Sequence, residues 1–240
     1  MTTRILIYQH MDRDRPGLIG EALQRRGLSI DINCPYLGEA VRDPSEYDAL
    51  VVMGGDMNVY QEEQFPWLAD ETRFIRQAAL DGQAILGVCL GGQLLARALD
   101  AIVRLGGAPE LGLAEIVLNA AGRADPLFEG LSSPESIVWH DDTFDISAGA
   151  VALASSEGCA NQAFRYGERA YGLQFHPEVT PALLEEWIAA APYLAVDDQR
   201  ALRAHFASRY AALQTQTDCL VENFLRRVPR AKPGTIDQSN

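Results

Sequence analysis

The sequence is poor in cysteine and in positive charge. Its 240 residues hold only four cysteines, with no Cys-x-x-Cys pair, so neither a disulfide framework nor a zinc ribbon is indicated. Lys and Arg total 20 against 33 Asp and Glu, a net charge of −13, and no long basic run occurs. Binding of nucleic acid or of an anionic membrane through a basic face is therefore excluded.

Long hydrophobic runs are also missing. The first apolar run breaks after four residues, which is too short for a signal-peptide core, and no later stretch reaches the ~18 apolar residues of a membrane span. We expect a soluble, cytoplasmic protein without a membrane partner. Hydrophobic residues still make up 48% of the chain, enough to bury a full core.

The first part of the chain alternates buried-strand and helix patterns. Short runs rich in Ile, Val and Leu predict strands, and helix-length segments at 18–26 and 67–80 lie between them. The predicted strands are 4–10, 28–34, 47–55 and 84–89. This alternation is typical of an α/β fold with a doubly wound sheet and a parallel centre.

Beyond the helix that follows Cys89, the pattern changes to short strands joined by turns, which predicts mixed or antiparallel additions to the sheet. These strands are expected at 102–105, 114–119, 137–140, 151–155, 163–166 and 170–176. Residues 197–228 carry an amphipathic helical pattern, interpreted as packing on its own domain, with a homodimer contact as the alternative. We predict a main domain over 1–192, a C-terminal helical extension over 193–230 and a disordered tail over 231–240.

Cys89 lies in the segment Gly87-Val-Cys-Leu-Gly91, after a predicted strand and before a helical pattern. Glycines two positions on either side of a nucleophile are typical of a tight strand-to-helix turn that exposes it at the carboxyl edge of a sheet. The helix amino end also favours a thiolate. A buried structural cysteine is the alternative for this motif taken alone.

The segment Gln174-Phe-His-Pro-Glu178 decides between these interpretations. In an extended segment, residues two apart share one side, so Glu178 can orient His176 and stabilise its charged form. His176 can then take the proton of the Cys89 thiol. We predict a catalytic Cys89, His176 and Glu178.

Attack on an amide requires donors for the developing oxyanion. The backbone N–H of Leu90 follows the nucleophile directly, and Gly54-Gly55 ends a buried strand, so we assign the oxyanion hole to the Leu90 and Gly55 amides. A turn that merely requires glycine is the alternative at this position. His10 and the charges at 12–15 are interpreted as a solvated loop, with a position at the rim of the site as the alternative.

These motifs, in this order over about residues 45–180, resemble the class I glutamine amidotransferases, and most closely the glutaminase domain of GMP synthetase and its stand-alone relatives. The resemblance implies a flavodoxin-like fold, a catalytic triad of cysteine nucleophile, histidine acid–base and glutamate, and no cofactor or metal. It also implies that Gln93 and backbone near Gly54, Gly55 and His140 hold a glutamine-like substrate.

Two departures concern the specificity of the site. Asp56 follows the paired glycines where the family usually has proline, and Asp141 stands where glycine is common. No Ser-Gly-Gly-Val-Asp-Ser loop and no Gly-x-x-x-x-Gly-Lys-Ser/Thr loop occurs, so we expect released ammonia to leave as product or to pass to a separate synthetase. Two further hypotheses stay open, a γ-glutamyl peptidase or hydrolase and a partner-activated glutaminase subunit or binding module.

Overall fold

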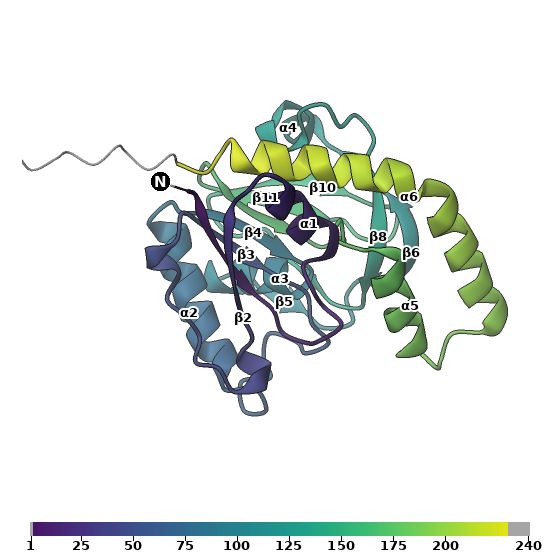
Figure 1. Cartoon of the computed structure of the whole chain (residues 1–240), viewed down its shortest axis with the longest axis horizontal. Coiled ribbons are helices and arrows are strands. Elements are labelled where there is room, and N and C mark those ends of the chain that lie inside the picture. The colour runs from purple at the N-terminus through teal and green to yellow at the C-terminus, as the bar shows by residue number, and fades with distance from the viewer. Residues whose placement is uncertain (1, 230–240) are drawn as a thin grey trace, which may run out of the picture.

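The fold is described from a computed structural model, which covers residues 2–229 (Figure 1). Within that range, eight strands form one sheet in the order β2-β1-β3-β4-β12-β11-β10-β7. The first five strands in this order are parallel, and β11, β10 and β7 continue the sheet antiparallel. Their bounds are β1 Arg4–Tyr8, β2 Ser29–Asn33, β3 Ala49–Val52, β4 Ala84–Val88, β7 Val117–Leu118, β10 Ala150–Ser155, β11 Ala163–Tyr166 and β12 Ala170–Leu173. The predicted doubly wound α/β sheet with antiparallel additions is confirmed.

Helices cover both faces of this sheet. The α-helices are α1 Gly17–Arg25, α2 Trp67–Leu80, α3 Leu90–Ala98, α4 Ala120–Ala124, α5 Pro181–Ala189 and α6 Val196–Leu225, and short 3₁₀ turns lie at Pro35–Leu37, Pro44–Glu46 and Pro126–Phe128. Because successive strand residues point to opposite faces, Ile5 and Ile7 pack in one core cluster with residues of α1 and α6. Leu6 and Tyr8 pack in a second cluster with residues of α2 and α3. The two-sided burial explains why these strands are apolar without alternation.

Two two-stranded antiparallel sheets are separate from the main sheet. β6 (Glu110–Glu115) pairs antiparallel with β8 (Glu135–His140), and β5 (Val103–Arg104) pairs with β9 (Thr143–Phe144). The predicted strand over 114–119 is divided between β6 and β7, because the chain changes partners near Ile116, from β8 to β10. The predicted strand over 170–176 ends at Leu173, and His176 instead forms an isolated bridge with Ile137.

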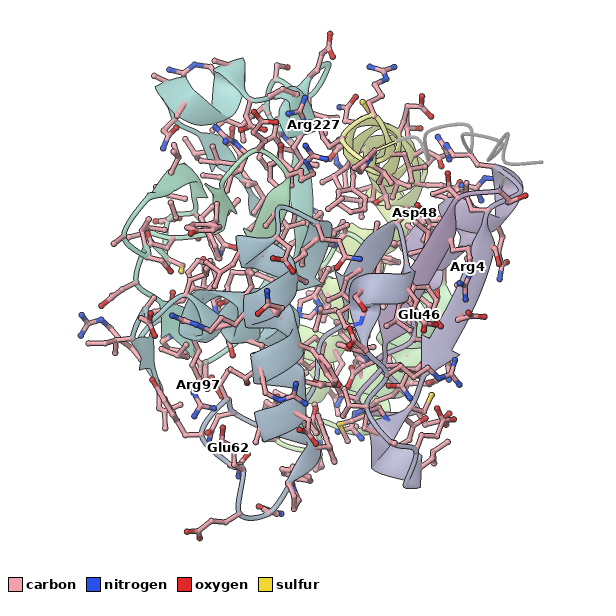
Figure 2. All side chains as sticks on the ribbon, turned by 90° about the vertical axis from the view of Figure 1, so that its left-hand side faces the viewer. Arg4, Glu46, Asp48, Glu62, Arg97 and Arg227 are labelled. Atoms are coloured by element: carbon pink, nitrogen blue, oxygen red, sulfur yellow. The ribbon has the colours of Figure 1, made fainter. Side chains whose placement is uncertain are left out.

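The loop between β3 and α2 is tied to α3 (Figure 2). Arg97 of α3 lies 2.9 Å from the Glu62 carboxylate, donates to the Val59 carbonyl and stacks over the Tyr60 ring. Residues of this loop line the cavity described below, so α3 helps to hold one of its walls.

Helix α6 packs on its own chain. In Figure 1 it runs along the top of the molecule and bends at the right toward α5. Leu220, Val221 and Phe224 are buried in the core cluster of α1, and Arg26 pairs with Glu222 at 2.9 Å. The interpretation of residues 197–228 as a helix on its own domain is supported, whereas the proposed domain boundaries stay predictions. The predicted tail over 231–240 lies outside the described residues, and no helix within 2–229 is long and apolar enough to cross a membrane.

Phe224→Ala tests how far α6 contributes to the core. Phe224 is 1% exposed, so its truncation should lower the free energy of unfolding by about 3–5 kcal/mol. Leu80→Ala, at a residue that is 55% exposed on α2, is the control and should change it by less than about 0.5 kcal/mol. Urea denaturation measures both, and equal small effects would contradict a core role for α6.

Candidate active site

Cys89 occupies a strained turn between β4 and α3. Its φ is 50° and its ψ is −108°, a conformation that non-glycine residues rarely adopt. The turn is tight enough that a side chain at Gly91 would collide with the carbonyl of Val52, and one at Gly87 with the backbone of Gly91. These contacts are the physical reason for the Gly-x-Cys-x-Gly pattern, and they leave the cysteine at the amino end of α3.

His176 and Glu178 follow β12 as a hydrogen-bonded pair. Nδ1 of His176 lies 2.7 Å from Oε1 of Glu178, and both side chains are buried. The His176 amide donates to the Ile137 carbonyl at 2.8 Å, and the Glu178 carbonyl accepts from the Leu18 amide of α1 at 2.8 Å. Since Nδ1 donates to the carboxylate, the Nε2 position of the ring is left for another partner.

The structure brings Cys89 and His176 together across Gly54. A β-carbon built on Gly54 would lie 3.3 Å from Cε1 of His176 and 3.7 Å from Cβ of Cys89, so only glycine fits comfortably between them. Burial disfavours the charged imidazole, but the charges of Glu178 and Cys89 and the hydrogen bonds to both outweigh it and hold the pKa of His176 well above its usual value. The ring is therefore set up to carry a proton beside the sulfur.

Two buried glutamines flank the cysteine. Nε2 of Gln93 donates to Oε1 of Gln174 at 3.2 Å, and Nε2 of Gln174 donates to the Cys89 sulfur at 3.6 Å. Gln174 was not predicted as a site residue, and its place in the Gln-Phe-His-Pro-Glu segment was the available signal. Gln93 also lines the cavity.

A buried ion pair supports the Gly54-Gly55 loop. Nδ1 of His10 donates to the Gly54 carbonyl at 2.8 Å, and Nε2 lies 3.0 Å from a Glu71 carboxylate oxygen, with both side chains fully buried. Burial opposes protonation, but Glu71 and the Gly54 carbonyl raise the pKa of His10. Trp67 stacks on the His10 ring at 5.4 Å. The interpretation of His10 as part of a solvated loop is wrong, because the chain after β1 turns inward beneath this loop.

His140 ends β8 in a dense polar cluster. Its Nδ1 donates to the Asp142 carbonyl at 3.0 Å and its Nε2 lies 3.3 Å from Glu110, while burial lowers its pKa. Ligand atoms of Glu110, His140 and Cys159 lie within 4.8 Å of one another and offer a donor set for a metal. However, the Glu110 carboxylate already accepts hydrogen bonds from Ser156 and Gln162, so the cluster is satisfied without an ion.

A cavity of about 680 Å³ joins these residues. Most of the predicted site residues line it, as do Asp56 and Asp141, the two departures from the family pattern, and further residues for which the sequence predicts no role. The predicted residues in its lining are Cys89, His176, Gln93, Gly55 and His140. The other lining residues include Arg13, Asp14, Asp56, Glu110, Leu111, Trp139, Asp141, Asp142, Trp187 and Tyr193. Asp56 forms an ion pair with Arg13 at this cavity, which accounts for one of the two departures noted in the sequence.

Thiol, imidazole and carboxylate thus meet at the carboxyl edge of a doubly wound α/β sheet, an arrangement that defines a class of thiol-dependent hydrolases. The model of the family "Glutamine amidotransferase class-I" matches residues 18–190. The chain therefore belongs to the class-I glutamine amidotransferase family.

Relatives of known name agree with this membership. The chain is 34% identical over 187 residues to the glutamine amidotransferase-like protein YfeJ of Salmonella typhimurium, covering 76% of this chain and 78% of that protein. It is 30% identical over 166 residues to one subunit of the glutamine-hydrolyzing GMP synthase of Saccharolobus solfataricus, covering 68% and 82%. A glutamine amidotransferase structure from Thermotoga maritima superposes with a TM-score of 0.85 at 29% identity, covering 96% and 100%.

Glu71→Gln tests the buried pair behind the glycine loop. Removing one partner of a buried ion pair should lower the free energy of unfolding by about 3–5 kcal/mol. Because the folded pKa of His10 is raised, its stabilising contribution is complete below the unfolded value near 6.5 and is lost as pH rises through the folded pKa. The gap between wild type and variant, measured by urea denaturation, should therefore narrow at alkaline pH.

Asp70→Asn is the matched control, since Asp70 pairs with Arg73 on the exposed face of α2. It should change the free energy of unfolding by less than about 0.5 kcal/mol at every pH. A Glu71→Gln variant as stable as this control would contradict the proposed pair.

Proposed function

We propose that the chain hydrolyses the γ-carboxamide of glutamine or of a related γ-glutamyl compound through a γ-glutamyl thioester on Cys89. The observation that carries this proposal is the strained Cys89 turn, which opens on a cavity that is also lined by His176, the partner of Glu178. Family membership supports amide hydrolysis as the reaction class. A nucleophile and a base oriented by a third group are the parts that covalent amide cleavage requires.

His176 acts as the acid and base. It holds the proton taken from the Cys89 thiol, so that the thiolate attacks the γ-carbonyl, and it then gives that proton to the departing nitrogen as the C–N bond breaks. Water, activated by the same imidazole, cleaves the thioester to release glutamate. Glu178 keeps Nδ1 protonated through its 2.7 Å hydrogen bond, so that Nε2 handles the proton in each step.

The amides of Gly55 and Leu90 form the oxyanion hole in this mechanism. In a trans peptide the C=O and the following N–H point in opposite directions. Since the Gly54 carbonyl is held by His10, the Gly55 N–H is directed away from His10. This orientation supports Gly55 as a donor, with the Glu71–His10 pair as the group that positions it. The Leu90 amide stands at the first turn of α3, where helix N–H groups lack intrahelical acceptors.

Substrate binding falls to Gln93, the Gly54 backbone and His140. Gln93 and His140 line the cavity from α3 and β8, and Gly54 separates Cys89 from His176. The name of the Saccharolobus solfataricus relative, which belongs to a glutamine-hydrolyzing GMP synthase, supports a separate ammonia-accepting synthetase as a partner. The proposal also includes a cytoplasmic localisation. A homodimer is the alternative to assembly with a synthetase.

A second candidate is a γ-glutamyl hydrolase acting on conjugates. The cavity of about 680 Å³ is large for glutamine alone, since pockets of this range hold drug-sized ligands. The chemistry at Cys89 would be the same, with an amine in place of ammonia as the leaving group.

Cys89→Ala should reduce turnover of every γ-glutamyl substrate by at least about 10³-fold, because the covalent route is lost. Release of glutamate from glutamine, measured by a coupled assay, is the readout. Cys34→Ala is the control, since Cys34 is half-buried on the loop after β2 and does not line the cavity. Full activity in the Cys89→Ala variant would end the proposal.

Glu178→Gln should lower the pKa of His176, because it removes the nearby charge that favours the protonated ring. A loss of about 10²- to 10⁴-fold in kcat is expected, as for other orienting carboxylates. Titration of His176 by NMR and steady-state kinetics measure the two effects. An unchanged His176 pKa with reduced activity would show that Glu178 acts only through structure.

A further inference from the structure

The cavity at Cys89 is strongly acidic. Among the described residues, five carboxylates line it against a single arginine, Arg13, and no lysine. Arg13 is already paired with Asp56, so it does not neutralise the others. The carboxylates are Asp14, Asp56, Glu110, Asp141 and Asp142. The field of a cavity walled in this way attracts cationic ligands.

Asp14 is the feature that points to a ligand. It is only 6% exposed, and within residues 2–229 its Oδ2 has no hydrogen-bond partner, although the residue lines the cavity. A buried carboxylate without a partner is costly, since it has lost water and gained nothing in return. Burial accordingly raises the pKa of Asp14. Oδ2 itself is closed to solvent, so an ammonium group in the cavity would compensate the Asp14 charge from the side on which the residue lines the cavity.

Asp14 lies on the leaving-group side of the site. The leaving nitrogen receives its proton from His176, so the leaving group must sit beside that ring. The loop that carries Asp14 is fixed there by Trp187, whose Nε1 donates to the Arg13 carbonyl at 2.8 Å and whose ring packs edge-on against His176 at 4.8 Å. The charges of His176 and Glu178 both act on the Asp14 carboxyl.

Aromatic side chains complete this side of the cavity. Trp139 packs edge-on against Trp187 at 5.8 Å, and its Nε1 donates to the Tyr193 hydroxyl at 3.3 Å. Aromatic faces bind organic ammonium groups and also cover methylene chains. Ammonia would use none of these features.

We propose, on the basis of the function proposed above, that the leaving group is a cationic amine and that the substrates are γ-glutamyl amides of aliphatic diamines or polyamines. Asp14 binds the distal ammonium, and the aromatic wall of Trp139, Trp187 and Tyr193 covers the methylene chain. The Cys89 sulfur forms a bond to the γ-carbonyl carbon, the C–N bond breaks, and the His176 proton goes to the departing nitrogen. Water then cleaves the thioester, giving glutamate, the free diamine and the restored thiol.

The test compares three substrates that share the γ-glutamyl group: L-glutamine, the γ-glutamyl amide of 1,4-diaminobutane, and the γ-glutamyl amide of n-pentylamine. The last replaces the distal ammonium by a methyl group of similar size. For wild type, kcat/KM for the diamine amide should exceed that for the pentyl amide at least about tenfold, the effect of one well-placed ion pair. Raising the salt concentration should reduce this ratio.

Asp14→Asn should reduce kcat/KM for the diamine amide about tenfold more than for the pentyl amide. Asp141 also lines the cavity but is exposed, so Asp141→Asn should not disturb the hydrophobic core. It should lower the ratio of kcat/KM for the diamine amide to kcat/KM for the pentyl amide by a smaller factor than Asp14→Asn does. Asp12→Asn, on the same loop but exposed and outside the cavity lining, is the control and should leave all three rates unchanged.

Equal loss on all three substrates in Asp14→Asn would overturn the inference, because Asp14 would then recognise the shared α-ammonium. A wild type that prefers the pentyl amide or glutamine would overturn it as well. Labelling of Cys89 by a γ-glutamyl diazoketone, detected as a mass shift, separates this failure from failure of the proposed function. A labelled but unselective enzyme refutes only the cationic leaving group, whereas an unlabelled and inactive one refutes both.

Discussion

The parallel pairing of β12 with β4 is the constraint on which the site depends. Gly172 lies opposite Gly87 and Leu173 opposite Val88, so the two strands end at the same level of the sheet. The Cys89 amide then donates to the Leu173 carbonyl at 2.8 Å, which fixes the turn of the cysteine to the strand that precedes His176. Segments far apart in sequence are thereby held in register by main-chain hydrogen bonds, and a slip of one residue would move the side chains to opposite faces.

Around this junction, buried polar groups replace the usual apolar packing. The Gln93–Gln174 pair, the His10–Glu71 pair and the His176–Glu178 pair each place a hydrogen-bonding group against Cys89 or the Gly54 loop. Such groups stabilise a fold less than apolar ones of equal volume would, because their desolvation offsets the gain. Their placement is therefore best explained by what they orient, namely the thiol, the glycine-loop peptide and the imidazole.

The sequence predicts those parts of the site that depend on local geometry. A turn as tight as the one at Cys89 leaves a glycine pattern, and an extended His-Pro-Glu segment puts two side chains on one side, so both are readable without tertiary information. Helix α2 has the predicted bounds, since Pro66 and Gly82 mark its ends locally. The sequence analysis does not predict helix α5, although Thr180 caps it and Pro181 opens it, and both are local signals of a helix start.

Groups whose environment is created by distant chain segments could not be predicted in this way. Asp14 and His10 sit among charged residues in sequence, a context typical of solvent exposure, yet both are buried by α2, α5 and the Gly54 loop. Gln174 resembles any strand residue until the register of β12 places it against Cys89. Burial of a polar residue in a loop is a tertiary property, and it is set by which elements the topology packs against that loop.

The charges in and around the cavity affect both proton transfer by His176 and the binding of a cationic leaving group. A raised pKa favours the protonated ring of His176, so the proton that the leaving nitrogen needs is already in place, and the ring can act as base toward water once it has given that proton up. The carboxylates that line the cavity also attract a cationic group of the substrate. The imidazolium of His176 repels such a group, so the group must be held away from the ring. A chain of methylenes along the aromatic wall provides this separation, since it carries the distal ammonium toward Asp14 while the scissile nitrogen stays at His176.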